Sequence, residues 1–183
     1  MEKKALIILA DGFEEIEAVT CIDILRRAGI KVVIAGLTDT QVTGSRNIII
    51  KSQTLLQEAG TDFDALILPG GMPGAENLAS SDTVKSLIKT FSNSNKLIAA
   101  ICAAPVIVLA PLGILKNKNA TCYPGMQNKT GSLMQYSEER VVVDRNLITS
   151  QGPGTALEFA LKVTEKLAGK KISEKVKKAA LAI

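Results

Sequence analysis

Short apolar runs of strand length alternate along this chain with stretches of helical periodicity, and this alternation restricts the fold more than any other feature. Strands that are buried on both faces form continuous apolar runs of this kind. Helices between such strands pack back onto the sheet, so we predict an α/β fold: a doubly wound, mostly parallel sheet with helices on both faces. Strands are expected at 5–10, 31–36, 64–69, 97–101, 141–143 and 147–150, and helices at 14–28, 82–91, 103–112, 156–168 and 173–183.

Turn and cap residues mark several of the expected boundaries. Gly29 is expected to end the first helix, and Asp82 to cap the helix that it begins. The run Asp144-Arg145-Asn146 is typical of a hairpin turn. The segment 41–50 fits a small hairpin at the edge of the sheet.

We expect one domain, 1–183, because the length of 183 residues suits a single domain and no linker, repeat or low-complexity tract divides it. The apolar run 5–10 is too short to span a bilayer and no cleavage site follows it, so we expect a cytoplasmic protein without a membrane partner.

The net charge of +4 comes from charges that are scattered along the chain, apart from a lysine cluster near the end of the sequence, and aromatic residues make up only 3%. We therefore expect no nucleic-acid partner.

The chain contains no histidine. This excludes Ser-His-Asp and Cys-His catalysis from its own residues, and every histidine-ligated metal site. The three cysteines are isolated and lack CxxC spacing, so they indicate neither a disulfide framework nor a metal site. We expect no cofactor, and proton transfer near pH 7 falls to a carboxyl group, a thiol, a lysine, a tyrosine or water.

Four loops are expected where predicted parallel strands end, and ligands bind at that edge of such sheets. Three of these loops are rich in glycine and the fourth presents a thiol, so we expect them to form one pocket. They are Asp11-Gly12-Phe13, Gly70-Gly71-Met72-Pro73-Gly74, Cys102 and Gly152-Pro153-Gly154-Thr155.

Cys102 stands between a predicted strand and a predicted helix, as the nucleophile does in a nucleophile elbow. Exposed backbone N–H groups and the positive end of the helix dipole would favour the thiolate there and lower the thiol pKa. The small neighbours Ala103 and Ala104 permit a sharp turn. The alternative is a cysteine that only packs in the core.

Glu17 shares one helix face with apolar neighbours, so its carboxyl group is expected to be partly buried. Burial would raise its pKa and let it donate a hydrogen bond to a thiolate. The alternative is a glutamate at the rim of the apolar stripe. Glu14 and Glu15, in the first turn, are explained by the helix dipole alone.

Three further features have both a functional and an ordinary interpretation. The Gly70–Gly74 loop either exposes backbone N–H groups to a ligand oxygen or forms a simple turn. Tyr123 either closes the pocket over Cys102 or packs beneath a loop. Arg46 is either solvated or placed at a subunit edge.

These segments together resemble the ThiJ/PfpI superfamily, in the branch that contains DJ-one and YajL. The resemblance runs nearly end to end and rests on five motifs in order. They are 5–17 with Glu14-Glu15-Ile16-Glu17, Arg26-Arg27-Ala28-Gly29-Ile30-Lys31-Val32, Leu68-Pro69-Gly70-Gly71, Ile98-Ala99-Ala100-Ile101-Cys102-Ala103 and Ser150-Gln151-Gly152-Pro153-Gly154-Thr155. It implies a flavodoxin-like fold and a homodimer.

The resemblance also implies roles for individual residues. Cys102 corresponds to the oxidation-sensitive nucleophile of the family and Glu17 to its protonated partner, while Gly71 and Ala103 supply backbone N–H groups. The other implied positions are the pocket residues Gly70, Tyr123, Gly152, Pro153 and Gly154, and Arg46, Arg27 and Glu14 near a subunit boundary. Many members have a histidine where Tyr123 stands, so a mechanism that needs an imidazole, as in Cys-His peptidases, is excluded here.

Three functional hypotheses follow. The first is a cysteine-dependent enzyme of glyoxalase or protein deglycase type, in which the Cys102 thiolate adds to a small reactive carbonyl or to glycated protein. The second is a non-enzymatic oxidative-stress sensor or redox-regulated chaperone in which Cys102 becomes a sulfinic acid. The third is a catalytically inactive dimer that binds a partner.

Overall fold

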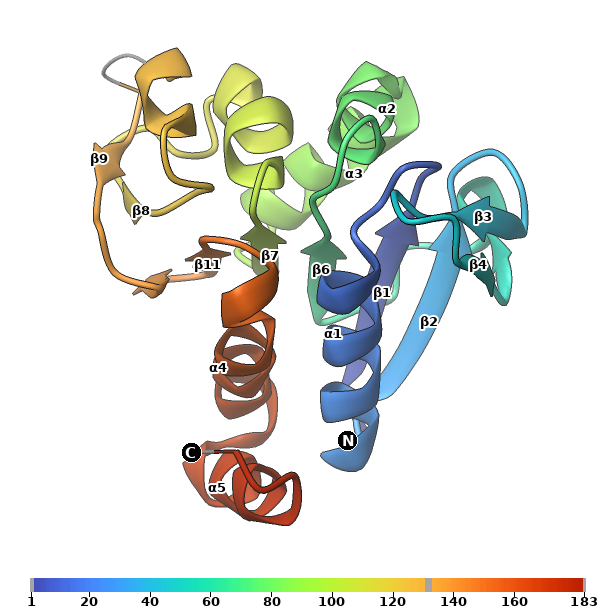
Figure 1. Cartoon of the computed structure of the whole chain (residues 1–183), viewed down its shortest axis with the longest axis vertical. Helices are drawn as coiled ribbons and strands as arrows, with labels where there is room; N and C mark the ends of the chain where they lie inside the picture. Colours follow the sequence, from blue (N-terminus) through green and yellow to red (C-terminus); the bar gives the residue numbers. More distant parts are fainter. Residues whose placement is uncertain (1, 131–132, 183) are drawn as a thin grey trace.

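The computed structural model describes residues 2–130 and 133–182, and a seven-stranded sheet forms its centre. The arrangement of the sheet and helices is shown in Figure 1. All neighbouring strands are parallel except β10 and β11, which form an antiparallel hairpin. The predicted α/β architecture is therefore confirmed. The strand order is β10 (Val141–Asp144), β11 (Leu147–Ser150), β7 (Leu97–Ile101), β6 (Ala65–Leu68), β1 (Lys4–Leu9), β2 (Lys31–Gly36) and β5 (Thr54–Leu55).

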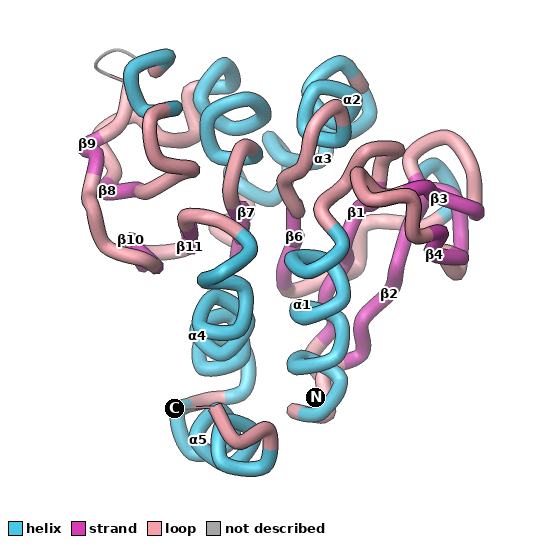
Figure 2. The backbone as a smooth tube through the Cα atoms, in the orientation of Figure 1, coloured by secondary structure: helices cyan, strands magenta, loops and turns pink. Residues whose placement is uncertain are grey.

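The sheet separates two apolar cores because successive side chains along each strand point to opposite faces. In β1, Leu6 and Ile8 face one core while Ile7 and Leu9 face the other. Helices cover both faces, as predicted (Figure 2). One core lies under α1 (Glu15–Arg27), α4 (Ala156–Ala168) and α5 (Lys170–Ala179), and the other under α2 (Gly74–Ser80), α3 (Asp82–Asn93) and the segment after β7.

The segment after β7 is less regular than the single helix expected at 103–112. It consists of a π-helical turn, η2 (Pro105–Leu109), followed by a 3-10 turn, η3 (Ala110–Leu112). Pro111 lacks a backbone N–H group, so an uninterrupted α-helical hydrogen-bond ladder cannot continue to the expected end of this helix.

Two predicted helix boundaries were wrong. Ser81, and not Asp82, caps α3, because its hydroxyl accepts a hydrogen bond from the backbone N–H of Val84 at 3.3 Å. The final helix runs over Lys170–Ala179 and begins directly after Gly169, where α4 ends, instead of at 173. Residue 183, which the prediction included, lies outside the described residues.

Several short elements carried no recognised sequence signal. They are α2 and β5 together with the small parallel pair β8 (Asn119–Ala120) and β9 (Gln135–Tyr136). The predicted hairpin at 41–50 is present as β3 (Gln41–Thr43) and β4 (Ile49–Lys51), but these strands form a separate two-stranded sheet. Within 2–130 and 133–182, no helix combines the length and apolar character needed to cross a bilayer.

Candidate active site

Cys102 occupies a sharp turn at the carboxyl end of β7. Its φ of 65° lies in the left-handed region, which a residue other than glycine adopts only when the surrounding structure holds it there. Two backbone hydrogen bonds do so: the Cys102 N–H donates to the carbonyl of Ser150 at 2.9 Å, and the Cys102 carbonyl accepts from the N–H of Tyr123 at 2.9 Å. The cysteine therefore sits at a strained elbow, as its sequence position predicts.

Glu17 reaches this elbow from α1. Its side chain is fully buried, and Oε2 accepts a hydrogen bond from the backbone N–H of Gly70 at 2.8 Å. A Cβ atom at Gly70 would lie 2.6 Å from the Cβ of Cys102 and 3.0 Å from Oε2 of Glu17. Only glycine fits between them, so three distant segments of the chain converge at one point.

The Gly70–Gly74 loop turns backbone N–H groups toward the sulfur. The N–H groups of Gly71 and Ala103 both interact with the Cys102 thiol and favour its ionised form. Gly71 has a φ of 90°, and a side chain there would collide with the backbone of Gly12 and Glu14. These two N–H groups are therefore held in place to stabilise negative charge on the sulfur or on an oxygen bound to it.

Burial governs the pKa values of the pair. It raises the pKa of Glu17 to about 7, against the opposing effects of the Gly70 N–H and the Cys102 thiol. Burial, followed by the negative charge of Glu17, raises the pKa of Cys102 to about 12. The expected lowering of the thiol pKa is therefore wrong while Glu17 is ionised, because the N–H groups of Gly71 and Ala103 are outweighed.

The two groups are close enough for their titrations to be coupled, so the pair loses one proton near neutral pH and keeps the other. The retained proton can reside on the sulfur or on the carboxyl group. Oε1 of Glu17 is buried and has no well-aligned hydrogen-bond partner among the described residues. A proton on Oε1 can therefore be donated to a thiolate, and this form of the pair is the nucleophilic one.

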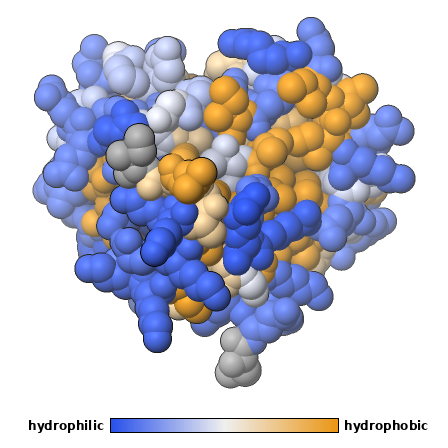
Figure 3. Space-filling model, turned by 60° about the horizontal axis from the view of Figure 1, so that its bottom comes forward, coloured by the Kyte–Doolittle hydropathy of each residue, from blue (hydrophilic) through white to orange (hydrophobic). Residues whose placement is uncertain are grey.

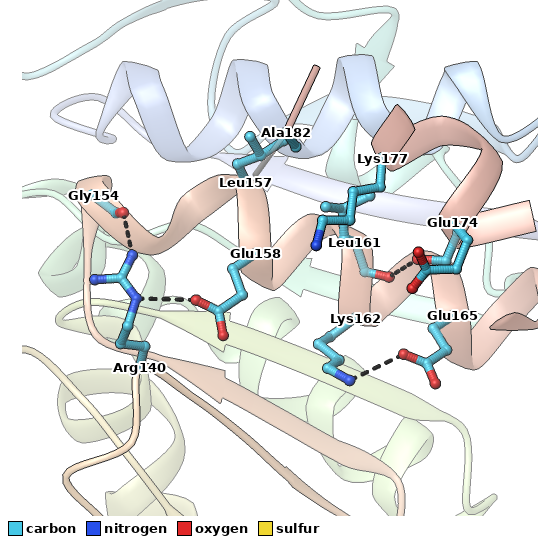
Figure 4. Close-up of a pocket in the computed structure, with 11 residues that line it drawn as sticks. Arg140, Gly154, Leu157, Glu158, Leu161, Lys162, Glu165, Glu174, Lys177 and Ala182 are labelled. Carbon is cyan, nitrogen blue, oxygen red and sulfur yellow. Dashed lines mark hydrogen bonds and ion pairs between the residues drawn. The ribbon is translucent and has the colours of Figure 1, made fainter. Parts of the chain in front are cut away.

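Tyr123 and Gly152 lie next to Cys102. Tyr123 is 49% exposed, so it does not pack beneath a loop. A Cβ atom at Gly152 would lie 3.4 Å from the Tyr123 ring and 4.0 Å from the sulfur of Cys102. The chain then leads outward through Pro153 to Gly154, whose carbonyl accepts a hydrogen bond from Arg140 at 2.8 Å (Figure 4).

The three residues expected near a subunit boundary do not contact Cys102 within the chain. Arg46 is exposed, and its guanidinium donates to the carbonyl of Ser45 at 3.2 Å. Arg27 is exposed and pairs with Asp23 at 2.7 Å on the same helix. Glu14 is buried at the start of α1, where it accepts a hydrogen bond from Ser45 at 3.2 Å.

Glu15 has a larger role than the helix dipole alone would give it. It is buried, and Oε1 accepts hydrogen bonds from the backbone N–H groups of Arg46 at 2.7 Å and Ile48 at 3.4 Å. Burial opposes ionisation, but these hydrogen bonds outweigh it and lower the pKa of Glu15. Glu15 thereby ties the β3–β4 hairpin to α1, which the sequence interpretation missed.

The other cysteines differ from Cys102. Cys21 and Cys122 are buried, whereas Cys102 is partly exposed. Burial raises the pKa of the Cys21 thiol and raises that of Cys122 to about 11. Across the described ranges, no cluster of three or more cysteine, aspartate or glutamate side chains is arranged to hold a metal ion.

The chain resembles known proteins over nearly its whole length. The model of the DJ-1/PfpI family matches residues 3–166. Protein dj-1beta of Drosophila melanogaster is 46% identical over 184 residues, covering 99% of this chain and 98% of that protein. The crystal structure of Drosophila melanogaster DJ-1beta superposes with a TM-score of 0.96 at 45% identity, with 100% of both chains covered.

Two further relatives differ in name or in length. Glutathione-independent glyoxalase DJR-1.2 of Caenorhabditis elegans is 39% identical over 171 residues, covering 92% of this chain and 90% of that protein. Protein DJ-1 homolog B of Arabidopsis thaliana is 46% identical over 178 residues, and this chain spans 40% of its length. The resemblance stated from the motifs and the flavodoxin-like fold are both confirmed. The chain belongs to the DJ-1/PfpI family.

Proposed function

We propose that this protein is a cysteine-dependent enzyme that acts on small reactive carbonyls, of glyoxalase or deglycase type. The observation that carries the proposal is the pairing of Cys102, at a strained elbow, with a buried Glu17 whose pKa is about 7. A thiol and a carboxyl group that share a proton near neutral pH suit nucleophilic addition followed by proton transfer. The 39% identity to a protein named as a glutathione-independent glyoxalase supports it.

The chemistry follows from the positions of these groups. Glu17 takes the thiol proton, and the Cys102 sulfur forms a bond to the aldehyde carbon of a 2-oxoaldehyde. The carbonyl electron pair moves to the oxygen, where the N–H groups of Gly71 and Ala103 stabilise the charge. The oxygen of the adduct then takes the proton back from Glu17 and becomes a hydroxyl group. The freed Glu17 carboxylate carries the proton from the former aldehyde carbon to the neighbouring carbon, while the hydroxyl proton passes to the oxygen of that neighbouring carbon. Water releases the resulting thioester as a 2-hydroxy acid and restores the thiol, so no oxidant or cofactor is consumed.

Substitution of Cys102 by alanine is expected to abolish the conversion of methylglyoxal to lactate, because the other two thiols, of Cys21 and Cys122, are buried. Lactate formation is measured with purified protein and no added glutathione. Cys122→Ala is the control, since Cys122 is buried and makes only a weak 3.5 Å contact with the carbonyl of Tyr123. Undiminished lactate from Cys102→Ala would contradict the proposal.

The raised pKa of Glu17 predicts a dependence of stability on pH. The folded state holds a proton that the unfolded chain releases near its ordinary pKa of 4.5. The free energy of unfolding is therefore greatest below that value and falls as the pH rises to about 7. Relative to Glu17→Gln, which does not titrate, the loss approaches about 3 kcal/mol. Parallel urea denaturation curves of both proteins between pH 4 and 8 measure it, and parallel pH profiles would refute the raised pKa.

A second candidate function is the sensing of oxidants, in which Cys102 is oxidised to a sulfinic acid. Oε1 of Glu17 has no well-aligned hydrogen-bond partner among the described residues. This favours the second function, because a protonated carboxyl group there can donate a hydrogen bond to a sulfinate oxygen.

Titration with hydrogen peroxide separates the two functions. If the protein is a sensor, its intact mass is expected to rise by two oxygens located at Cys102, with no turnover of methylglyoxal. Glu17→Gln, whose amide is a weaker donor to the sulfinate, is expected to continue to the sulfonic acid at lower peroxide concentrations. A Cys102 that stays reduced under peroxide would eliminate this function.

We also propose that the protein is a homodimer. Ile16 and Val19 on α1 and Ile48 and Ile49 at the β3–β4 hairpin are large, apolar and about half exposed. A broad apolar patch lies beside hydrophilic residues on the face shown in Figure 3. Pairing of two copies through this surface would cover it.

Two valines of equal exposure test the dimer. Val19→Lys places a charge on the apolar face of α1 and is expected to give monomers in size-exclusion chromatography with light scattering. Val143→Lys is the matched control, because Val143 is 47% exposed, against 48% for Val19, and lies on the edge strand β10. Dimerisation that survives Val19→Lys, or that is lost equally in both variants, would reject this surface.

A further inference from the structure

A buried pair of hydroxyl groups lies next to the nucleophile and has no role in the proposed chemistry. Ser150, the last residue of β11, and Thr155, which precedes α4, are both buried, and their hydroxyl oxygens are 2.6 Å apart. They lie at opposite ends of the loop that contains Gly152. The same strand end also carries the Ser150 carbonyl that accepts the N–H of Cys102.

The hydroxyl of Thr155 binds the backbone N–H of Gly152. It accepts a hydrogen bond from the Gly152 N–H at 3.0 Å and lies 2.8 Å from the Gly152 carbonyl. Ser150 in turn donates to the carbonyl of Arg140 at 2.9 Å. Because Ser150 uses its single proton there, its oxygen is free to accept the proton of Thr155. The backbone of Gly152 is thus fixed to β11 by side chains that water does not reach.

Thr155 does not use its hydroxyl as a residue at this position usually does. A threonine directly before a helix commonly caps the free N–H groups of the first turn. Here the Thr155 side chain makes no such bond to α4. The hydroxyl is directed back to Gly152, which precedes the 3-10 turn Pro153–Thr155, so it fixes that turn and the Gly152 loop and not the first turn of α4.

Gly152 lies beside the sulfur and the Tyr123 ring. The space that a side chain at 152 would fill lies 4.0 Å from the Cys102 sulfur and 3.4 Å from the Tyr123 ring. On the outer side, Arg140 binds the carbonyl of Gly154 and the carboxylate of Glu158 (Figure 4). The loop is therefore fastened on both sides, and a shift of Gly152 changes the gap through which an electrophile approaches.

We propose that Thr155 is a positioning residue that, through Gly152, sets the size of the electrophile that Cys102 admits. Small aldehydes pass between Gly152 and Tyr123, whereas carbonyl compounds with a bulky substituent are excluded while the loop is held. The proposal rests on Cys102 as the reactive thiol of the proposed function. It assigns selectivity to a residue that touches neither the sulfur nor the substrate.

Two maleimides of different size test this proposal on the whole protein. The rate constants for modification of Cys102 by N-methylmaleimide and N-phenylmaleimide are measured by peptide mass mapping, with Cys102→Ala as the background. Thr155→Val keeps the shape but loses the hydroxyl, so the ratio of the phenyl to the methyl rate is expected to rise about fivefold. Thr155→Ser retains the hydroxyl and is expected to keep the parent ratio.

Thr164→Val, within α4, is the matched control for the loss of a buried threonine hydroxyl. Thr164 is buried and donates to the carbonyl of Ala160 at 2.9 Å, in the second half of α4. A purely structural role for Thr155 would lower the melting temperature of both valine variants and leave both ratios unchanged. That result, or an equal change of the ratio in Thr155→Ser and Thr155→Val, would overturn the proposal.

Ser150→Ala decides the question if Thr155→Val does not fold. It leaves the hydrogen bond from the Gly152 N–H to Thr155 in place but removes the anchor of Thr155 on β11, so a smaller rise of the same ratio is expected. An unchanged ratio would overturn the proposal. Neither measurement requires carbonyl turnover. Absence of lactate with a shifted ratio would contradict the proposed function alone, while normal lactate formation with an unchanged ratio would contradict only the role of Thr155.

Discussion

The burial of one carboxyl group, that of Glu17, determines the chemistry available to this protein. A carboxylate removed from water is unfavourable unless hydrogen bonds or opposite charges compensate it. Here a single backbone N–H, from Gly70, is directed at Oε2, and Oε1 has no well-aligned partner among the described residues. The incomplete compensation keeps the pKa of Glu17 near 7, so the group can accept and return a proton at neutral pH.

Glycines make this arrangement sterically feasible. Glu17 and Cys102 approach each other across Gly70, where a methyl group would collide with the Cβ of Cys102. Gly71 adopts a φ of 90° against the backbone of the first loop, which directs its N–H to the sulfur. The loop after β6 therefore brings its backbone close to the reactive groups. This approach is possible because Gly70 and Gly71 have no side chains.

The fold and the central pair could be predicted from the sequence because they depend on local patterns. Continuous apolar runs fix β1, β6 and β7, and the position of Cys102 at the end of one such run fixes the elbow. The direction of its pKa shift could not be predicted, since it depends on how deeply a carboxyl group from another helix is buried. Glu15 was undervalued for the same reason: its hydrogen bonds to Arg46 and Ile48 span 31 and 33 residues.

The absence of histidine also explains why the two partners must be so close. An imidazole with an ordinary pKa near 6.5 can serve as a base while remaining exposed. A carboxyl group reaches a comparable pKa only by losing most of its hydration, and the same low-dielectric surroundings raise the pKa of the neighbouring thiol. The sulfur can therefore carry negative charge only when Glu17 holds the proton. In this site the Cys102 thiolate and the Glu17 carboxylate belong to two protonation forms of one coupled pair. The N–H groups of Gly71 and Ala103 favour the form in which the sulfur is charged and Glu17 is protonated.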